Sequence, residues 1–311
     1  GEGAGEGAQS TGTRSPHDVA AAPSVRRLAR ELGVDITAVE GSGPGGRVSA
    51  ADVKDSAGAE GTPEAGKAHE QAAGDTGATR RDISAIRKAT ARNTSASWQQ
   101  IPHVTHFQEA GIAKLNAYIE EHQDEVQKAG GKLTVSSLIV KLLAHGLMSF
   151  PRFNAAFDQD ASQLVLHSHA NIAVAVDTDD GLLVPVIRRA EQKHVRDIAV
   201  EITELADRAR EGELSGEDLQ GGTFALSNIG AIGGKFFTPL IMQSQAAILG
   251  LGRSYHRPVW NGQAFEPVPT LPLSLSYDHR AIDGADAARF LTWLQDAIED
   301  PMSAMMGGDA V

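Results

Sequence analysis

The chain has 311 residues, a formal net charge of −12 and no cysteine. Without cysteine, this sequence excludes disulfides, thiolate metal sites and a cysteine nucleophile, and we expect no metal site. The acidic excess argues against nucleic acid or an anionic membrane as the main partner, because both favour clustered Lys and Arg. The longest apolar stretch, Leu133 to Phe150, is interrupted by Lys141 and His145, so we expect no bilayer-spanning segment. The N-terminus has no basic-then-apolar signal, which predicts a cytoplasmic location.

The composition changes sharply along the chain. Every Phe, Tyr and Trp lies at or after Trp98, so the preceding part cannot bury a large core. Residues 1–15 and 55–79 are rich in Gly, Ala and Glu, which is typical of flexible linkers. Between them, residues 16–54 predict a small helical module. Residues 80–311 predict one domain of the α/β class.

Two short helices are predicted in the small module. The first follows Pro23 and ends at Gly33, and the second begins after Ser49 as N-cap. The apolar face of the first helix is expected to comprise Val25, Leu28, Ala29 and Leu32.

The stretch between these helices, Gly41 to Gly46, matches the G-x-G-x-x-G dinucleotide fingerprint. That motif binds phosphate only where it follows a strand and opens a helix, and here a helix precedes it. We therefore predict a glycine loop joining two helices.

Arginines cluster on the module. They form either a solvated face or a docking patch for an acidic protein surface, and they are Arg26, Arg27, Arg30 and Arg47.

The larger domain alternates helical and strand patterns, which favours an α/β fold. Helices are predicted over 135–150, 195–210 and 285–298. Strands are predicted over 164–166, 172–176, 182–187, 223–226, 246–251 and 273–277, the last of them half-buried.

The strongest chemical motif is H-x-x-x-D-G, formed by His279, Asp283 and Gly284 between a predicted strand and a predicted helix. A histidine at a strand end can transfer a proton near neutral pH. Asp283 could hold that imidazole or pair with an arginine that braces the loop, and Gly284 would permit a tight entry to the helix. Alternatively, His279 merely caps a turn.

Ser227 ends another predicted strand and is followed by Asn228. Its hydroxyl could be a nucleophile or an oxyanion donor, or simply a turn former. The G-x-S-x-G motif is absent around it, which weakens a hydrolase interpretation.

Together these motifs resemble the dihydrolipoamide acyltransferases, the core components of 2-oxo acid dehydrogenase complexes. The resemblance rests on S-Y-D-H-R-x-x-D-G at 276–284, S-N-I-G-x-I-G-G at 227–234 and D-G-L-L-V-P-V at 180–186. Residues 16–54 resemble the peripheral-subunit-binding domain of the same family.

The resemblance implies a role for each motif residue. His279 would be the general base that deprotonates a thiol, and Ser227 the oxyanion donor, with Asn228 in a supporting position. Asp283 would support the histidine loop by pairing with Arg87. The implied fold is similar to chloramphenicol acetyltransferase, with a mixed sheet and flanking helices in two layers.

The resemblance also implies partners. Coenzyme A would be a substrate, and a lipoyl domain not found in this sequence would supply the lipoyl group. The residues at 1–14 resemble the end of an interdomain linker, so we expect a longer natural chain. A homotrimer would place His279 opposite Ser227 of a neighbour and assemble into a larger core. The arginines of the small module would bind dihydrolipoamide dehydrogenase or the 2-oxo acid decarboxylase.

Acyl specificity is expected to be acetyl, because residues 101–107 and 257–265 resemble the acetyltransferases of pyruvate dehydrogenase complexes. Residues 226–230 also resemble branched-chain enzymes, so branched-chain acyl transfer is the second hypothesis. Two less favoured hypotheses are a serine hydrolase using Ser227, His279 and Asp283, and a non-catalytic docking scaffold.

Overall fold

A computed structural model describes residues 19–59 and 79–305, and the chain divides into two compact units between Arg80 and Arg81. The predicted linker at 1–15 and most of the one at 55–79 lie outside the described residues. Among the described helices, none is long and apolar enough to cross a membrane. The predicted cytoplasmic location stays a prediction.

The first unit is built from two short helices, α1 (Pro23–Glu31) and α2 (Ala50–Ala59), around a small apolar core. Gly33, in the left-handed region at φ 70°, ends α1 as predicted. Ser49 accepts a hydrogen bond from the Asp52 amide at 3.3 Å, which is the predicted N-cap. One prediction is wrong: Leu32 is 46% exposed, because it follows the last turn of α1 instead of lying on its buried face. Helix α2 also continues to Ala59, beyond the boundary predicted at residue 54.

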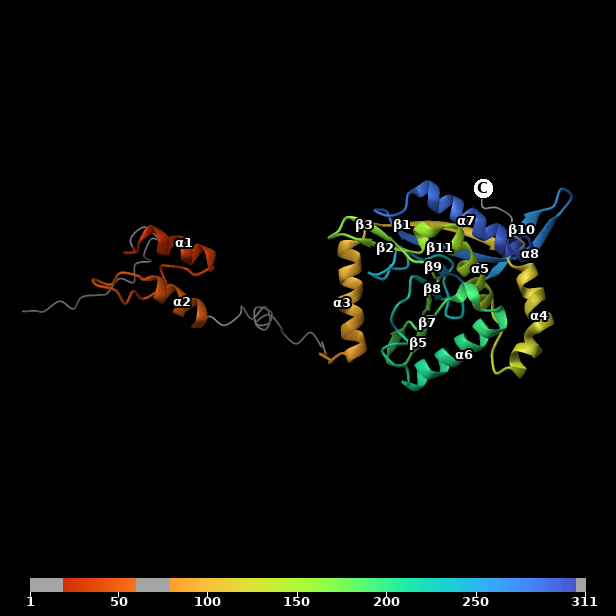
Figure 1. The fold of residues 1–311 in the computed structure, drawn as a ribbon, viewed down its shortest axis with the longest axis horizontal. Helices are drawn as coiled ribbons and strands as arrows, with labels where there is room; N and C mark the ends of the chain where they lie inside the picture. The colour runs from red at the N-terminus through yellow and green to blue at the C-terminus, as the bar shows by residue number, and fades with distance from the viewer. Residues whose placement is uncertain (1–18, 60–78, 306–311) are drawn as a thin grey trace, which may run out of the picture. The chain divides into compact units, whose positions relative to one another are not determined.

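The second unit has a mixed seven-stranded sheet, which confirms the predicted fold class (Figure 1). Its strand order is β1-β11-β9-β8-β4-β7, with β10 paired to β11. Strands β4, β8 and β9 are parallel, and the remaining pairs are antiparallel. The strands are β1 (His103–Gly111), β4 (Ile172–Val174), β7 (Val186–Ile187), β8 (Phe224–Asn228), β9 (Ala247–Leu251), β10 (Tyr255–Trp260) and β11 (Phe265–Asp278).

Two hairpins lie outside this sheet. One pairs β2 (Ala155–Asp158) with β3 (Gln163–Leu166), and the other pairs β5 (Val176–Thr178) with β6 (Gly181–Leu183). The strands predicted over 172–176 and 182–187 are therefore each broken. The second break falls at Pro185, which has no N–H to donate to a ladder and whose carbonyl accepts from the Val174 amide at 2.8 Å.

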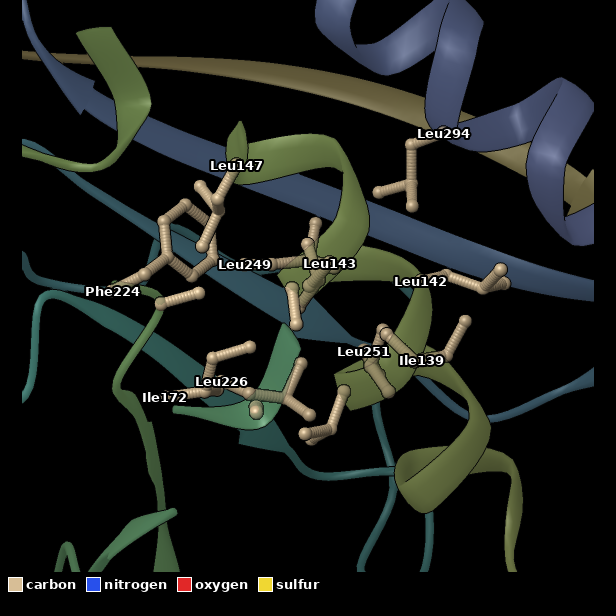
Figure 2. Packing of buried hydrophobic residues seen from close by; sticks show 14 of the residues in the cluster. Ile139, Leu142, Leu143, Leu147, Ile172, Phe224, Leu226, Leu249, Leu251 and Leu294 are labelled. Atoms are coloured by element: carbon tan, nitrogen blue, oxygen red, sulfur yellow. The ribbon is translucent and has the colours of Figure 1, made fainter. Parts of the chain in front are cut away.

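Helices cover one face of the sheet and bury the main core against it. Helix α5 (Val135–Ser149) passes over the strands, and its leucines lie between the sheet residues and Leu294 of α7 (Gly284–Glu299) (Figure 2). It begins with a capping box, in which Thr134 and Ser137 exchange hydrogen bonds at 3.2 and 3.0 Å. The other helices are α3 (Ala85–Gln100), α4 (Ala113–Lys128), α6 (Val195–Glu211), α8 (Pro301–Met305) and the short η1 (Pro151–Phe153) and η2 (Ala190–Gln192).

The opposite face of the sheet is covered as well, which corrects the half-buried strand predicted over 273–277. Ser274 and Ser276 on that face of β11 are both fully buried. The Phe237 amide donates to the Ser274 hydroxyl at 3.4 Å, and Ser276 is hydrogen-bonded to Thr105 of β1 at 2.8 Å. The small polar residues that suggested exposure instead have partners inside the fold.

Candidate active site

His279 follows the last residue of β11, at the strand end predicted from the sequence. Its backbone N–H donates to the Pro102 carbonyl at 3.1 Å. The chain then turns tightly, because the amides of Ala281 and Ile282 both donate to the Asp278 carbonyl at 3.0 Å. The imidazole is exposed in the single chain and stands beside the fully buried ring of Tyr277, with ring centroids 5.8 Å apart.

An arginine does brace this turn, but its partner is Asp278 and not Asp283. Arg280 forms an ion pair with the buried Asp278 carboxylate at 2.7 Å. Asp283 is exposed at the N-cap of α7, where its side chain makes no capping hydrogen bond. Burial, and secondly the negative charge of Asp283, raises the pKa of the Tyr277 hydroxyl.

The predicted partner Arg87 lies near the start of α3, whose N-cap Ser84 accepts from the Arg87 amide at 3.2 Å. Helix α3 packs on β6, and Arg87 itself is exposed. Within the described part of the chain, Arg87 and Asp283 form no ion pair.

Gly284, predicted for a tight helix entry, has no left-handed backbone. A Cβ there would meet the Tyr277 hydroxyl at 3.7 Å and His106 at 4.0 Å, which are ordinary contacts. The geometry therefore gives no steric reason for glycine at this position.

Ser227 lies at the carboxyl end of β8 and is half-buried. It sits opposite Gly250 of β9 in the sheet register, and Gly250 in turn lies opposite Ser274 of β11. A Cβ on Gly250 would approach the Phe237 ring to 2.5 Å, so only a glycine at this position leaves room for the ring as it is placed. The Ser227 hydroxyl has no hydrogen-bond partner among the described residues and remains available to a ligand.

Asn228 anchors the turn after Ser227. Its side-chain Nδ2 donates to the Ser136 hydroxyl at the start of α5 at 2.8 Å, and its side-chain Oδ1 accepts from the Gly230 backbone amide at 2.8 Å. The supporting position implied for Asn228 is thus a connection between β8, the following loop and α5.

One residue of this region was missed by the sequence reasoning. Arg253 donates from its guanidinium to the carbonyls of Gly230, Ala231 and Ile232 at 3.0, 3.1 and 3.1 Å. Its backbone amide also donates to Gly234 at 2.8 Å. No sequence pattern joins Arg253 to that loop, because the contact depends on the adjacent placement of β8 and β9.

Within one chain, Ser227 and His279 lie at opposite ends of the sheet. Strand β9 lies between β8 and β11, parallel to β8 and antiparallel to β11, so Ser227 is level with Ser274, before the carboxyl end of β11. Ser227 is level with Gly250, whereas the Asp278 amide bonds to Ala246. Gly250 and Ala246 are four residues apart in the chain, which at about 3.3 Å per residue is about 13 Å along the strand direction. Ser227 and His279 are also two strand spacings apart across the sheet. A single chain therefore does not assemble a Ser–His pair, which removes the serine hydrolase hypothesis in its one-chain form.

Comparison with known proteins agrees with this arrangement of motifs. Residues 75–306 match the model of the 2-oxoacid dehydrogenases acyltransferase (catalytic domain). The chain belongs to this family. Residues 19–54 match the e3 binding domain.

Several curated relatives of this acyltransferase share one description. The dihydrolipoyllysine-residue acetyltransferase component of the pyruvate dehydrogenase complex from Cupriavidus necator is 42% identical over 299 residues, covering 90% of this chain and 54% of that protein. The Azotobacter vinelandii protein of the same description is 40% identical over 311 residues, covering 93% and 47%. The chain thus spans about half the length of the curated relatives it matches.

Solved structures of family members superpose on the acyltransferase. The dihydrolipoamide acetyltransferase of Azotobacter vinelandii has a TM-score of 0.72 at 42% identity, covering 73% of this chain and 94% of that one. Crystallographic and enzymatic investigations of that protein concern the role of a serine, a histidine and an asparagine in its catalytic mechanism. The cubic core of a pyruvate dehydrogenase multienzyme complex gives the same TM-score of 0.72 at 41% identity, with the same coverage.

Proposed function

We propose that this acyltransferase moves an acetyl group between dihydrolipoamide and coenzyme A, as the core component of a pyruvate dehydrogenase complex. The named relatives support the acetyl group and the complex. The separation of Ser227 from His279 carries the mechanistic part of the proposal, because it requires a site shared between two chains.

The serine and histidine named for the Azotobacter protein support the assignment of roles. They are separated in that sequence by the same number of residues as Ser227 and His279. The asparagine follows the histidine at the interval that Asp283 takes here. We assign His279 as general base, Ser227 as oxyanion donor and Asp283 as a residue that influences the histidine turn.

Proton transfer begins the reaction. An ordinary thiol is mostly protonated near neutral pH, whereas the thiolate is the nucleophile. His279 takes the proton as the sulfur attacks the thioester carbonyl carbon, and the carbonyl oxygen becomes an oxyanion. Ser227 of the neighbouring chain donates a hydrogen bond to that oxygen, a contribution of about 3 kcal/mol for one such donor. The intermediate then expels the second sulfur, which takes the proton back from His279.

The assembly follows from the same geometry. A heterologous contact repeated in a closed ring gives every His279 a Ser227 from its neighbour. We propose a trimer, as the family resemblance implies, that assembles further into a larger core. The lipoyl group would arrive on a lipoyl domain, and the small module would bind dihydrolipoamide dehydrogenase through its arginines.

A histidine replacement tests the proposal. In His279→Ala, acetyl transfer from acetyl-coenzyme A to dihydrolipoamide should be lost while assembly is retained. His256→Ala is the matched control, because His256 is an exposed histidine of β10. Near wild-type turnover in His279→Ala would overturn the assignment.

Acyl specificity needs a separate measurement. A panel of acetyl-, succinyl- and isobutyryl-coenzyme A donors with dihydrolipoamide should show the highest kcat/KM for acetyl. A preference for isobutyryl would favour the branched-chain hypothesis. A non-catalytic scaffold is disfavoured, since a strand-end histidine and an available serine hydroxyl are both present.

A further inference from the structure

The two residues that flank His279 are joined to each other. Asp278 is only 1% exposed, and its carboxylate accepts from the Arg280 backbone amide at 2.9 Å. It also accepts from the Arg280 guanidinium, through Nε at 3.0 Å and Nη2 at 2.7 Å. A buried carboxylate is costly unless it is paired and fully hydrogen-bonded, so this two-point contact is a requirement of the position.

The guanidinium of Arg280 has a second set of partners on the β2–β3 hairpin. It lies 4.5 Å from the centre of the Phe157 ring, and its Nη1 donates to Oε1 of the Gln159 side chain at 3.1 Å. The hairpin belongs to a separate two-stranded sheet. Arg280 therefore connects the end of β11 to an element that is otherwise outside the main sheet.

These contacts restrict the backbone on both sides of His279. The Asp278 amide is bonded to Ala246 at 2.8 Å and the His279 amide to Pro102 at 3.1 Å, so two neighbouring segments hold the peptide. The imidazole itself has no hydrogen bond to a described residue. Its direction consequently depends on the backbone of residues 278–280 and on the adjacent Tyr277 ring.

We propose that Arg280 is a positioning residue for His279, acting through Asp278 and held in place by Phe157 and Gln159 of the β2–β3 hairpin. The inference rests on the proposed function, in which His279 is the general base. A guanidinium is needed because it bonds both carboxylate oxygens while its flat face packs on the aromatic ring. A lysine would keep the charge but would lose the two-point geometry.

The expected signature is a loss in kcat with little change in KM. A small displacement of a catalytic base costs up to about 100-fold in rate, whereas substrate binding depends on other groups. We expect Arg280→Lys to lower kcat by about 10- to 100-fold. Phe157→Leu, which removes only the aromatic face, should give a smaller fall of the same kind.

The experiment compares Arg280→Lys, Arg280→Ala and Phe157→Leu in the assembled protein, using the transfer assay. Arg289→Ala is the matched control, because Arg289 forms an exposed ion pair with Asp286 on α7. Added ethylguanidinium should restore part of the activity of Arg280→Ala, since the native side chain is 25% exposed and its removal opens the place to solvent. The His279 imidazole resonances in ¹⁵N-labelled protein should shift in the Arg280 variants and stay constant in Arg289→Ala.

Two results would overturn the proposal. One is wild-type kcat in Arg280→Lys and Phe157→Leu while His279→Ala is inactive, which would leave the proposed function intact. The other is a fall in activity that follows only the loss of folded protein, with unshifted imidazole resonances and no rescue. Activity in His279→Ala would instead refute the proposed function itself.

Discussion

Ser227, on β8, and His279, directly after β11, stand at opposite ends of one sheet, and β9 separates these two strands. Both residues are accessible to some degree in the single chain, and neither has a side-chain hydrogen bond within the described residues. A hydroxyl and an imidazole held so far apart cannot act on the same carbonyl. The chemistry proposed for this acyltransferase is therefore a property of the assembly.

Mixed assemblies provide the first prediction. Ser227→Ala and His279→Ala should each abolish or strongly reduce transfer, and the serine variant should lose about 100- to 1,000-fold. When the two variants are dissociated and reassembled together in equal amounts, about one quarter of the sites should combine an intact histidine with an intact serine from the neighbour. Acetyl transfer should recover accordingly.

A control mixture separates this effect from general stabilisation. Reassembling His279→Ala with the double variant His279→Ala/Ser227→Ala supplies no intact histidine and should remain inactive. Absence of recovery in the first mixture, despite demonstrated mixed assemblies, would contradict a site shared between chains.

The second prediction concerns Gly250, which lies beside Ser227 in the register. A Cβ at this position would come within 2.5 Å of the Phe237 ring, so the ring must shift from its place over the sheet. We expect Gly250→Ala to destabilise the protein by about 1–3 kcal/mol. It should also reduce acetyl transfer, because a displaced Gly250 would move the neighbouring Ser227. Urea unfolding measures the first effect.

Gly216→Ala serves as its control, because a Cβ there meets only a flexible glutamine side chain at 3.9 Å. Similar unfolding midpoints for the two alanine variants would show that the Phe237 contact is unimportant.

The sequence identified the motif residues but not their spatial relation. The strand-end positions of His279 and Ser227 followed from local patterns, since an apolar run and the polar residue after it are adjacent in the chain. Strand order depends on pairing between distant segments, and no local pattern determines it. The opposite-end geometry therefore became visible only in the fold.

The same limit explains two differences between the expectations from sequence and the single-chain fold. The sequence offered Asp283 as the partner of an arginine, whereas Asp278 is the paired carboxylate. The difference arises from burial: Asp278 ends the central strand β11 and loses water, while Asp283 begins a helix at the surface. The alternation of polar and apolar residues in β11 likewise suggested a solvent-exposed face, but the segment that contains Phe237 covers that face.

The third prediction concerns the arginines of the small module. Arg27, Arg30 and Arg47 are exposed, and the half-buried Arg26 donates to the Val19 carbonyl at 2.6 Å. The test reverses the charge of Arg27, one of the exposed members of the cluster. We expect Arg27→Glu to weaken binding to dihydrolipoamide dehydrogenase by about 10-fold at low salt, with a smaller effect at high salt.

Isothermal titration at two salt concentrations measures this difference, and Lys88→Glu, an exposed change on α3, is the control. Equal affinities for Arg27→Glu and the unmodified protein at low salt would exclude Arg27 from the interface.

The fourth prediction uses Asp52, which organises the same module. Its carboxylate accepts from the Ser42 hydroxyl at 2.6 Å, the Ser49 amide at 2.8 Å and the Ser42 amide at 3.1 Å. These hydrogen bonds, led by the Ser42 hydroxyl, hold the pKa of Asp52 well below its ordinary value. Folding then favours the carboxylate, so its stabilisation is complete above about pH 4 and is lost as the pH falls below that.

Asp52→Asn should therefore lower the amide exchange protection of residues 19–59 at pH 7, because a module this small has little other stabilisation. The difference from the unmodified chain should shrink as the pH falls below about 4, because the Asp52 carboxylate of the unfolded chain then gains a proton while the folded chain keeps it charged. Hydrogen exchange read by mass spectrometry on the whole chain reports this segment separately from the acyltransferase. Asp55→Asn, an exposed neighbour on α2, should leave protection unchanged. If these amides were equally protected in both variants at pH 7, the hydrogen bonds of Asp52 to the Ser42 loop would not stabilise the module.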